Sequence, residues 1–125
     1  IPEELPALLK AYRIQEKASK VGFDWKEEAP VFEKIIEEIN ELKLNVNNEE
    51  PIDKIEDELG DVLFSIVNYS RFLKINPEDA LRRTIRKFRD RFQKIEMYAE
   101  ENNKVLDEMG LEEMDNIWNK AKEKI

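Results

Sequence analysis

The sequence predicts an all-α protein: one domain of about five helices in a bundle, arranged around a central antiparallel helix hairpin. Two observations predict this fold class. Apolar residues recur with the 3.6-residue period of amphipathic helices along most of the 125 residues, and hardly any segment alternates as a strand does. A chain of this length forms one core, so we expect residues 1–125 to be a single helical domain. The sequence begins with Ile1 rather than Met, which leaves open that it is part of a longer chain.

The first helix is expected from Pro6 to about Lys20, because proline is favoured at the first helical position. Gly22 follows, and glycine commonly ends helices. The connector after it contains Phe23 and Trp25, which are unusual in a segment that should be polar. Two interpretations stay open: both rings cap the core, or a flat ring stacks on a ligand.

The second helix is expected to open at Pro30 and the third to begin near Ile52. Each carries one apolar stripe, as the central pair of a bundle requires. In the second helix this stripe consists of Phe32, Ile35, Ile36, Ile39, Leu42 and Val46. Residues 45–51 between them are rich in Asn and end in proline, which indicates a short loop. The two helices should therefore fold back on each other as an antiparallel hairpin.

Both hairpin helices contain the same pattern of apolar and acidic residues, with two carboxylates three residues apart on one helix face. The two copies are Ile35-x-x-Glu38-Ile39-x-Glu41-Leu42 and Ile55-x-x-Glu58-Leu59-x-Asp61-Val62. In an antiparallel hairpin, residues equidistant from the turn face each other. Glu41 is then paired with Glu58, and Glu38 with Asp61. The spacing therefore predicts four carboxylates at one level, which is a possible metal site.

Acidic pairs at helical spacing are common in a chain with 29 Asp and Glu residues, so plain exposure to water is the alternative for each pair. The match in register favours the metal site. Gly60 favours it too, because a glycine inside a helix costs roughly 1 kcal/mol relative to alanine and needs a reason. Close approach of another backbone or of a ligand beside Asp61 is the simplest one.

Composition excludes several classes of site and partner. The net charge of -8 argues against a protein that binds nucleic acid through a broad basic face. The sequence contains no Cys and no His, so a metal site here must use oxygen ligands, which suit Mg²⁺ or Mn²⁺. No apolar run is long enough to cross a membrane and no secretory signal is visible, so a cytoplasmic location is expected.

The segment Asn76-Pro77-Glu78-Asp79 is a strong helix start, and the fourth helix should run from Pro77 to about Glu100. It carries seven basic residues on two flanks of an apolar stripe. One flank holds Arg83, Lys87, Arg91 and Lys94, and the other holds Arg82, Arg86 and Arg89. By itself such a ridge is more commonly a solvated face. Beside a four-carboxylate site it instead favours a polyphosphate ligand, which needs a metal and a local basic cluster.

Residues 101–110 are expected to form a loop, followed by a last helix from Leu111. Trp118 lies on its apolar side, and Lys122 follows one turn later on the same side. Plain core packing is the alternative interpretation for Trp118.

These residues resemble the MazG-type nucleoside triphosphate pyrophosphohydrolases, whose motif is Glu-Glu-x-x-Glu followed after a spacer by Glu-x-x-Asp. The matching segments here are Glu37-Glu38-Ile39-Asn40-Glu41 and Glu58-Leu59-Gly60-Asp61. Further segments look like the C-terminal domain of two-domain MazG proteins: Val21-Gly22-Phe23-Asp24-Trp25, Leu59-Gly60-Asp61-Val62-Leu63-Phe64, Lys87-Phe88-Arg89-Asp90-Arg91-Phe92 and Trp118.

The resemblance implies an all-α fold, Mg²⁺ bound by the carboxylates, and dimers with the site near their interface. By resemblance the metal ligands are Glu38, Glu41, Glu58 and Asp61. By resemblance the nucleotide contacts are Lys87, Arg91, Trp118 and Lys122. Asn40 stands where some members carry Asp, which bears on an acid-base role there but not on the metal site.

The expected reaction is hydrolysis of a nucleoside triphosphate between its α- and β-phosphates, which yields the monophosphate and pyrophosphate. The catalytic set is Glu37, Glu38, Glu41, Glu58 and Asp61, with Glu37 or a metal-bridging carboxylate accepting the proton. Trp25 joins the four nucleotide contacts as a substrate-binding residue. We expect a homodimer or a higher homo-oligomer. The alternatives are a helical interaction module with decorative acid pairs, and a domain that senses nucleotides without hydrolysing them.

Overall fold

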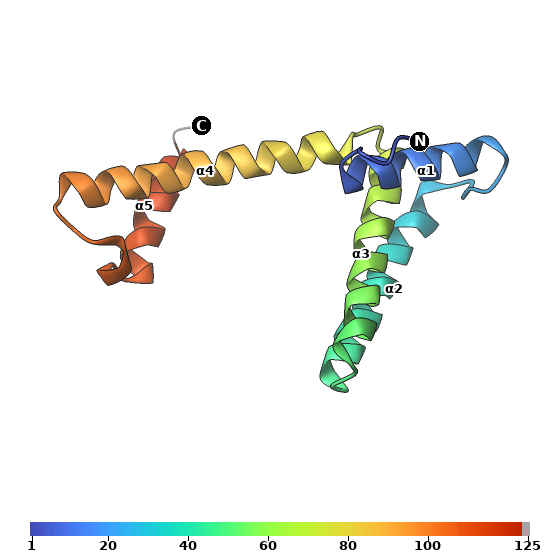
Figure 1. The fold of residues 1–125 in the computed structure, drawn as a ribbon, viewed down its shortest axis with the longest axis horizontal. Helices are drawn as coiled ribbons and strands as arrows, with labels where there is room; N and C mark the ends of the chain where they lie inside the picture. Colours follow the sequence, from blue (N-terminus) through green and yellow to red (C-terminus); the bar gives the residue numbers. More distant parts are fainter. Residues whose placement is uncertain (124–125) are drawn as a thin grey trace. The chain divides into compact units, whose positions relative to one another are not determined.

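The computed structural model describes residues 1–123, and its regular structure is entirely helical (Figure 1). The elements in order are α1 (Ala7–Lys20), α2 (Glu28–Asn47), α3 (Ile52–Phe72), α4 (Pro77–Glu101), the 3-10 helix η1 (Leu106–Glu108) and α5 (Leu111–Glu123). The prediction of an all-α protein with about five helices is confirmed. Among these helices, none is long and apolar enough to cross a membrane. The chain divides into two compact units, Ile1–Ala80 and Leu81–Ile125, the second of which is described as far as Glu123.

The first unit contains α1 and the hairpin of α2 and α3, which run side by side and antiparallel, as the sequence predicted (Figure 1). Its buried apolar residues are Val31, Ile35, Val62 and Val67. Helix α1 packs against α3 and is tied to it by one hydrogen bond, from Gln15 Nε2 to the carbonyl oxygen of Phe64 at 2.9 Å.

Several expected helix limits are off by one turn or less. Helix α2 begins at Glu28, so Pro30 lies within its first turn, where the missing N–H is tolerated because those N–H groups have no intrahelical partner. The same helix continues to Asn47, which shortens the loop from residues 45–51 to residues 48–51. The segment 101–110, expected as loop, contains the short helix η1.

Helices α1 to α4 end in one hydrogen-bonding pattern, with a residue of positive φ just beyond the helix. Gly22 has that role after α1, with φ 91°, and Phe23 N–H donates to the carbonyl oxygen of Ala18 at 3.1 Å. The expected stop at Gly22 is therefore confirmed. After the next three helices the residues with positive φ are Glu49, Lys74 and Asn103.

The start of α4 follows its sequence signal. The side-chain oxygen of Asn76 accepts hydrogen bonds from the backbone N–H groups of Glu78 at 2.9 Å and Asp79 at 3.2 Å. These are two of the N–H groups that a helix leaves unpaired at its first turn. The expected N-cap is therefore confirmed, and it sets where α4 begins.

The second unit is held by a cluster around Ile95, Ala99 and Met109, which are buried. Half-buried apolar residues from α4, η1 and α5 pack against it, namely Phe92, Tyr98, Leu106, Met114, Ile117 and Trp118. The 3-10 helix supplies Leu106 to this cluster. A short apolar turn thus closes the connection between α4 and α5.

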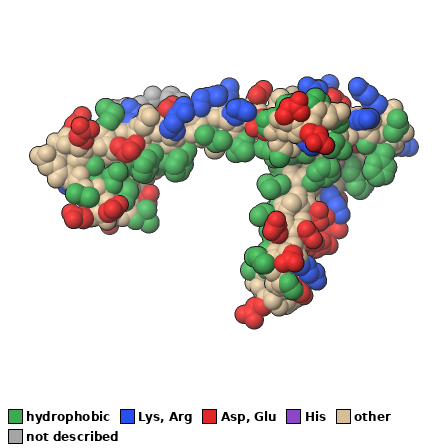
Figure 2. Space-filling view, viewed as in Figure 1, with side chains coloured by type: hydrophobic (Ala, Val, Ile, Leu, Met, Phe, Trp, Pro, Cys, Tyr) green, Lys and Arg blue, Asp and Glu red, His purple; other side chains and the backbone are tan. Residues whose placement is uncertain are grey.

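Many large apolar side chains of both units are exposed, and Figure 2 shows them along the hairpin and along α4. The stripe of α2 that the sequence predicted as core is largely in this class, since Ile36 is 45% exposed and Ile39 42%. On the facing helix Leu59 and Leu63 are both 47% exposed. Apolar surface on this scale is uncommon on monomeric proteins and usually marks an interaction surface.

Candidate functional site

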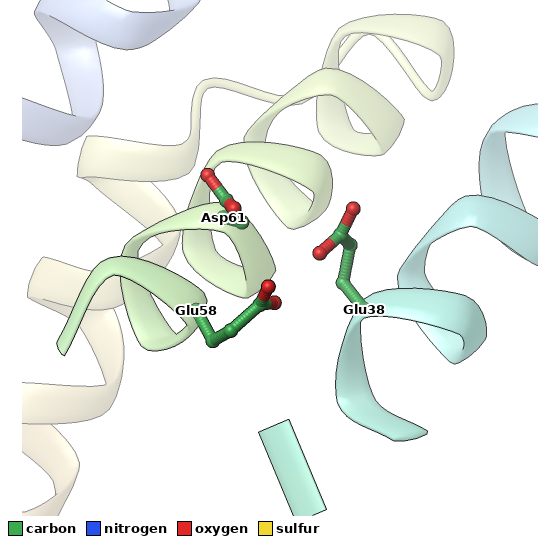
Figure 3. Close-up of side chains that lie close together, drawn as sticks. All are labelled: Glu38, Glu58 and Asp61. Atoms are coloured by element: carbon green, nitrogen blue, oxygen red, sulfur yellow. The ribbon is translucent and has the colours of Figure 1, made fainter. Parts of the chain in front are cut away.

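Three of the four predicted metal carboxylates lie together on the hairpin. Glu38 comes from α2, and Glu58 and Asp61 come from α3, one turn apart (Figure 3). Each offers one carboxylate oxygen, and these oxygens lie within 4.8 Å of one another. The hairpin register, together with the spacing of three residues on α3, is what brings the three groups to one place. This acidic cluster could hold a metal ion.

Glu38 is the most enclosed member of the cluster, with only 7% of its surface exposed. Lys34, one turn earlier on α2, places its ammonium 3.1 Å from Oε1 of Glu38. The other oxygen, Oε2, is buried without a hydrogen-bond partner, and so is Oε2 of Glu58. Leaving a buried acceptor unpaired is costly, and more so when it carries charge. Two unpaired carboxylate oxygens aimed into one cluster fit a bound cation.

The cluster is also electrostatically strained without a cation. Partial burial, the hydrogen bond that a protonated Glu58 shares with Glu38, and the negative charges of Glu41, Glu38 and Asp61 raise the pKa of Glu58 to about 7. Glu41, the fourth predicted ligand, is exposed and contributes to this field, although it lies outside the close group of three.

Glu37, the candidate proton acceptor, lies on the solvent side of α2. Its side chain is 56% exposed, and Lys34 Nζ donates to its Oε1 at 3.3 Å. Lys34 therefore contacts two acidic residues at once, and the hydrogen bond to Glu38, with a further one to Glu37, raises its pKa. Lys34 was not among the predicted site residues, although its i,i+4 spacing to Glu38 is the signal that indicates such a contact.

A cavity of about 680 Å³ opens beside the cluster, within the first unit. Glu38 and Asp61 line it, and so does Trp25, the predicted aromatic contact. The rest of its wall is largely apolar: Ile14, Ala18, Phe23, Val31 and Phe64. Trp25 is 48% exposed, so it is not enclosed in the core, and both interpretations of this residue, a cap on the core and a ring that stacks on a ligand, stay open.

The connector that carries Trp25 is fixed by an ion pair that the sequence did not indicate. Arg71 donates to the two carboxylate oxygens of Asp24 at 2.9 and 2.5 Å. Asp24 also accepts from the backbone N–H of Trp25 at 2.8 Å and from Ser19 Oγ at 2.7 Å. Mainly because of Arg71, the pKa of Asp24 falls to about 2. The partners are 47 residues apart, and no local pattern links them.

The predicted nucleotide contacts on α4 and α5 belong to the second unit. Arg91 lies over the ring of Trp118, 5.5 Å from its centre, and its Nε is buried without a hydrogen-bond partner. Trp118 also packs against Phe88, with 5.0 Å between ring centres, so core packing accounts for part of its role. Lys87 and Lys122 are exposed. Their binding of phosphate stays a prediction.

No neighbouring part of the described chain approaches Gly60 closely, and the expected approach of a ligand there stays a prediction. A Cβ added at this position would meet no atom within 4 Å. Neither a neighbouring backbone nor a packed side chain of this chain therefore requires a glycine here. The structure offers no physical reason for Gly60 beside Asp61.

The sequence is similar to a known protein family and to named proteins of two bacteria. Residues 27–95 match the family model described as the MazG nucleotide pyrophosphohydrolase domain. A Thermotoga maritima protein named nucleoside triphosphate pyrophosphohydrolase/pyrophosphatase MazG is 52% identical over 118 residues, which cover 94% of this chain and 45% of that protein. The nucleoside triphosphate pyrophosphohydrolase of Escherichia coli is 37% identical over 124 residues, covering 98% and 47%. The chain thus spans about half the length of these curated relatives.

The raised pKa of Glu58 predicts how stability changes with pH when no metal is bound. The folded state keeps a proton that the unfolded state releases above its ordinary pKa, so the free energy of unfolding should fall as pH rises from about 4.5 through about 7. Urea unfolding in EDTA should show this fall for the unaltered protein. Glu58→Gln should flatten it, whereas Glu56→Gln, an exposed neighbour on α3, should not. Parallel curves for all three proteins would contradict the assignment.

Proposed function

The chain belongs to the MazG family of nucleotide pyrophosphohydrolases, as its resemblance implied, and from this premise we propose that it hydrolyses a nucleoside triphosphate to the monophosphate and pyrophosphate. The observation that carries the proposal is the cluster of Glu38, Glu58 and Asp61 with its two unpaired buried oxygens. The matched proteins of T. maritima and E. coli are named for an activity of this kind. Because this chain covers only about half of each, its own activity is part of the proposal.

Mg²⁺, or Mn²⁺ in its place, is the proposed cofactor. Glu38, Glu58 and Asp61 would hold it, with Glu41 close enough to add negative charge. An all-oxygen donor set suits these hard cations. When bound, the ion would neutralise phosphate charge and lower the pKa of a coordinated water molecule.

The remaining roles fall to the chain itself. Lys34 orients Glu38 through its contact at 3.1 Å. Glu37, which is exposed, is one candidate to accept the proton of the attacking water, and a carboxylate of the cluster is the other. Lys87 and Arg91 would bind phosphate oxygens, and the ring of Trp118 limits where the Arg91 guanidinium can lie.

One observation disfavours the alternative of a helical interaction module with decorative acid pairs. Decorative carboxylates face water, whereas Glu38 is buried and Glu58 has a buried oxygen with no partner. Such groups destabilise the apo fold and are typical of sites that bind a ligand. A domain that senses nucleotides without hydrolysing them would have the same cluster, so only an activity measurement separates it from an enzyme.

The first prediction of this proposal is pyrophosphate release from mixed nucleoside triphosphates in the presence of Mg²⁺. EDTA should abolish it. Glu38→Gln and Asp61→Asn should each lower the rate about 100-fold or more, because the metal supplies several kcal/mol of transition-state stabilisation. Glu33→Gln, an exposed residue of α2, is the matched control.

Release that persists in EDTA would rule out the metal site. Nucleotide binding without any release would instead support a sensor.

A second prediction tests the basic helix. Lys87→Ala and Arg91→Ala should each cost about 2 to 4 kcal/mol in transition-state stabilisation, measured from kcat/KM, the range for removal of one preorganised donor. Arg89→Ala should cost little, because Arg89 lies on the other flank of the apolar stripe, and its side chain is 61% exposed. Equal and small losses in all three variants would mean that the basic flank is a solvated surface.

We also propose that the chain forms a homodimer or a higher homo-oligomer. The exposed apolar side chains of the hairpin, such as Ile36 and Leu63, support this proposal. Sedimentation at micromolar concentration should show a particle larger than one chain. Leu63→Asp should shift it towards the monomer, while Glu33→Asp should leave it unchanged. A monomer of the unaltered protein at these concentrations would contradict the proposal.

A further inference from the structure

The cavity beside the carboxylate cluster has the composition of a ligand pocket rather than of a packing defect. Its wall is mostly apolar and aromatic, and one side is formed by Glu38 and Asp61. Ligand sites generally combine such walls with a few well-placed polar groups. A molecule that fits both parts has a flat, weakly polar body joined to a strongly anionic group that a metal can neutralise.

Gln15 is the polar group of this cavity that stands out. It is 7% exposed, and its Nε2 donates to the carbonyl oxygen of Phe64 at 2.9 Å. A carbonyl oxygen only accepts hydrogen bonds, so this contact fixes which end of the amide is the nitrogen. The other end, Oε1, is a buried acceptor with no partner. A donor group on a ligand would relieve the cost of that unpaired acceptor.

Other oxygens along the cavity are already engaged. Both carboxylate oxygens of Asp24 accept hydrogen bonds from Arg71. The side-chain oxygen of Asn68 also accepts from Arg71, at 3.2 and 2.9 Å. These bonds form one network in which Gln15 takes no part. Among the residues that line the cavity, Gln15 Oε1 and Glu38 Oε2 are the buried acceptors with no partner, and only Gln15 Oε1 lies outside the carboxylate cluster. The network also holds the connector, and with it Trp25, at the cavity wall.

We propose that this cavity binds the base of the nucleoside triphosphate and that Gln15 Oε1 accepts a hydrogen bond from an exocyclic amino group, as adenine and cytosine present it. Trp25 offers a flat ring on which the base can stack. The proposal rests on the proposed function, since that function places the phosphates at the carboxylates. A base with an oxo group at the same position would set two acceptors against each other, and the site would reject it.

The Asp24–Arg71 ion pair has a positioning role in this proposal. No contact with the base or the phosphates is assigned to it, but it fixes the backbone N–H of Trp25 and therefore where the ring can lie. Gln15 is fixed in a similar way, by the Phe64 carbonyl on α3. Both polar anchors of the pocket are thus set by α3, the helix that carries Glu58 and Asp61. A shared support of this kind keeps the base pocket and the carboxylates in a constant relation.

The test compares substrates that differ in the amino group. ATP and purine riboside triphosphate differ at that group alone, and CTP and UTP carry an amino and an oxo group at the same ring position. On the unaltered protein, kcat/KM should favour the amino-bearing member of each pair by about tenfold or more. Gln15→Leu should lower only the amino-bearing substrates and bring both ratios near one. Gln93→Leu, an exposed residue of α4, is the control for the same change of side chain.

Equal kcat/KM within both pairs on the unaltered protein would overturn the inference while leaving the proposed hydrolysis intact. This comparison needs no variant, so it holds even if Gln15→Leu fails to fold. If no triphosphate is hydrolysed, the proposed function fails, and binding of adenosine against purine riboside tests the pocket by itself. Tenfold tighter binding of adenosine would support the base pocket. Equal binding, or no binding of either nucleoside, would overturn it, as expected if apolar side chains of a second copy fill the cavity.

Discussion

Repulsion among Glu38, Glu58 and Asp61 is the constraint on which the rest of the first unit depends. Three acidic groups with oxygens within 4.8 Å of one another favour separation or protonation, and the raised pKa of Glu58 is the sign of that stress. The hairpin must hold them together by packing elsewhere. Yet the buried apolar residues of the unit are few and mostly small, chiefly Val31, Val62 and Val67. The cluster therefore has a cost in stability that a cation would offset, so binding of the proposed metal would be thermodynamically linked to folding.

Contacts between α1, the connector that follows it and α3 fix the residues around the cavity beside the carboxylate cluster. Gln15 bonds to the backbone of α3, and Arg71 near the end of α3 holds Asp24. These are long-range polar contacts in a unit with little core, and they are directional where apolar packing is not. Local precision at the cavity thus comes from a few hydrogen bonds, which is how a helical unit of modest core can present a defined site.

Local signals in the sequence predicted the fold well because they act over one helical turn. Asn76 caps α4 and Gly22 ends α1, as the known preferences of Asn for helix starts and of Gly for helix ends predict. The hairpin register also followed from spacing alone. Local signals could not reveal the Asp24–Arg71 pair, since its partners are far apart in sequence, nor the left-handed conformation of Lys74, which its residue type disfavours. Gly60 shows another limit, because helix propensity gives the cost of a glycine but does not identify the neighbour or ligand that explains it.

The exposed apolar stripe of α2 is a feature that the pattern of a single chain did not predict. Periodicity predicted that Ile36 and Ile39 are covered, and in this chain they are not, although Ile35, next to Ile36, is buried. The spacing of apolar residues predicts that a helix face is shielded from water, but it does not predict which molecule shields it. Both helices of the hairpin carry such a face, and they carry the carboxylates as well. Whatever covers the face therefore also bears on the spacing of the two helices, and so on how closely Glu38 approaches Asp61. The proposed association and the proposed metal binding would for this reason be coupled, because both act on the same pair of helices.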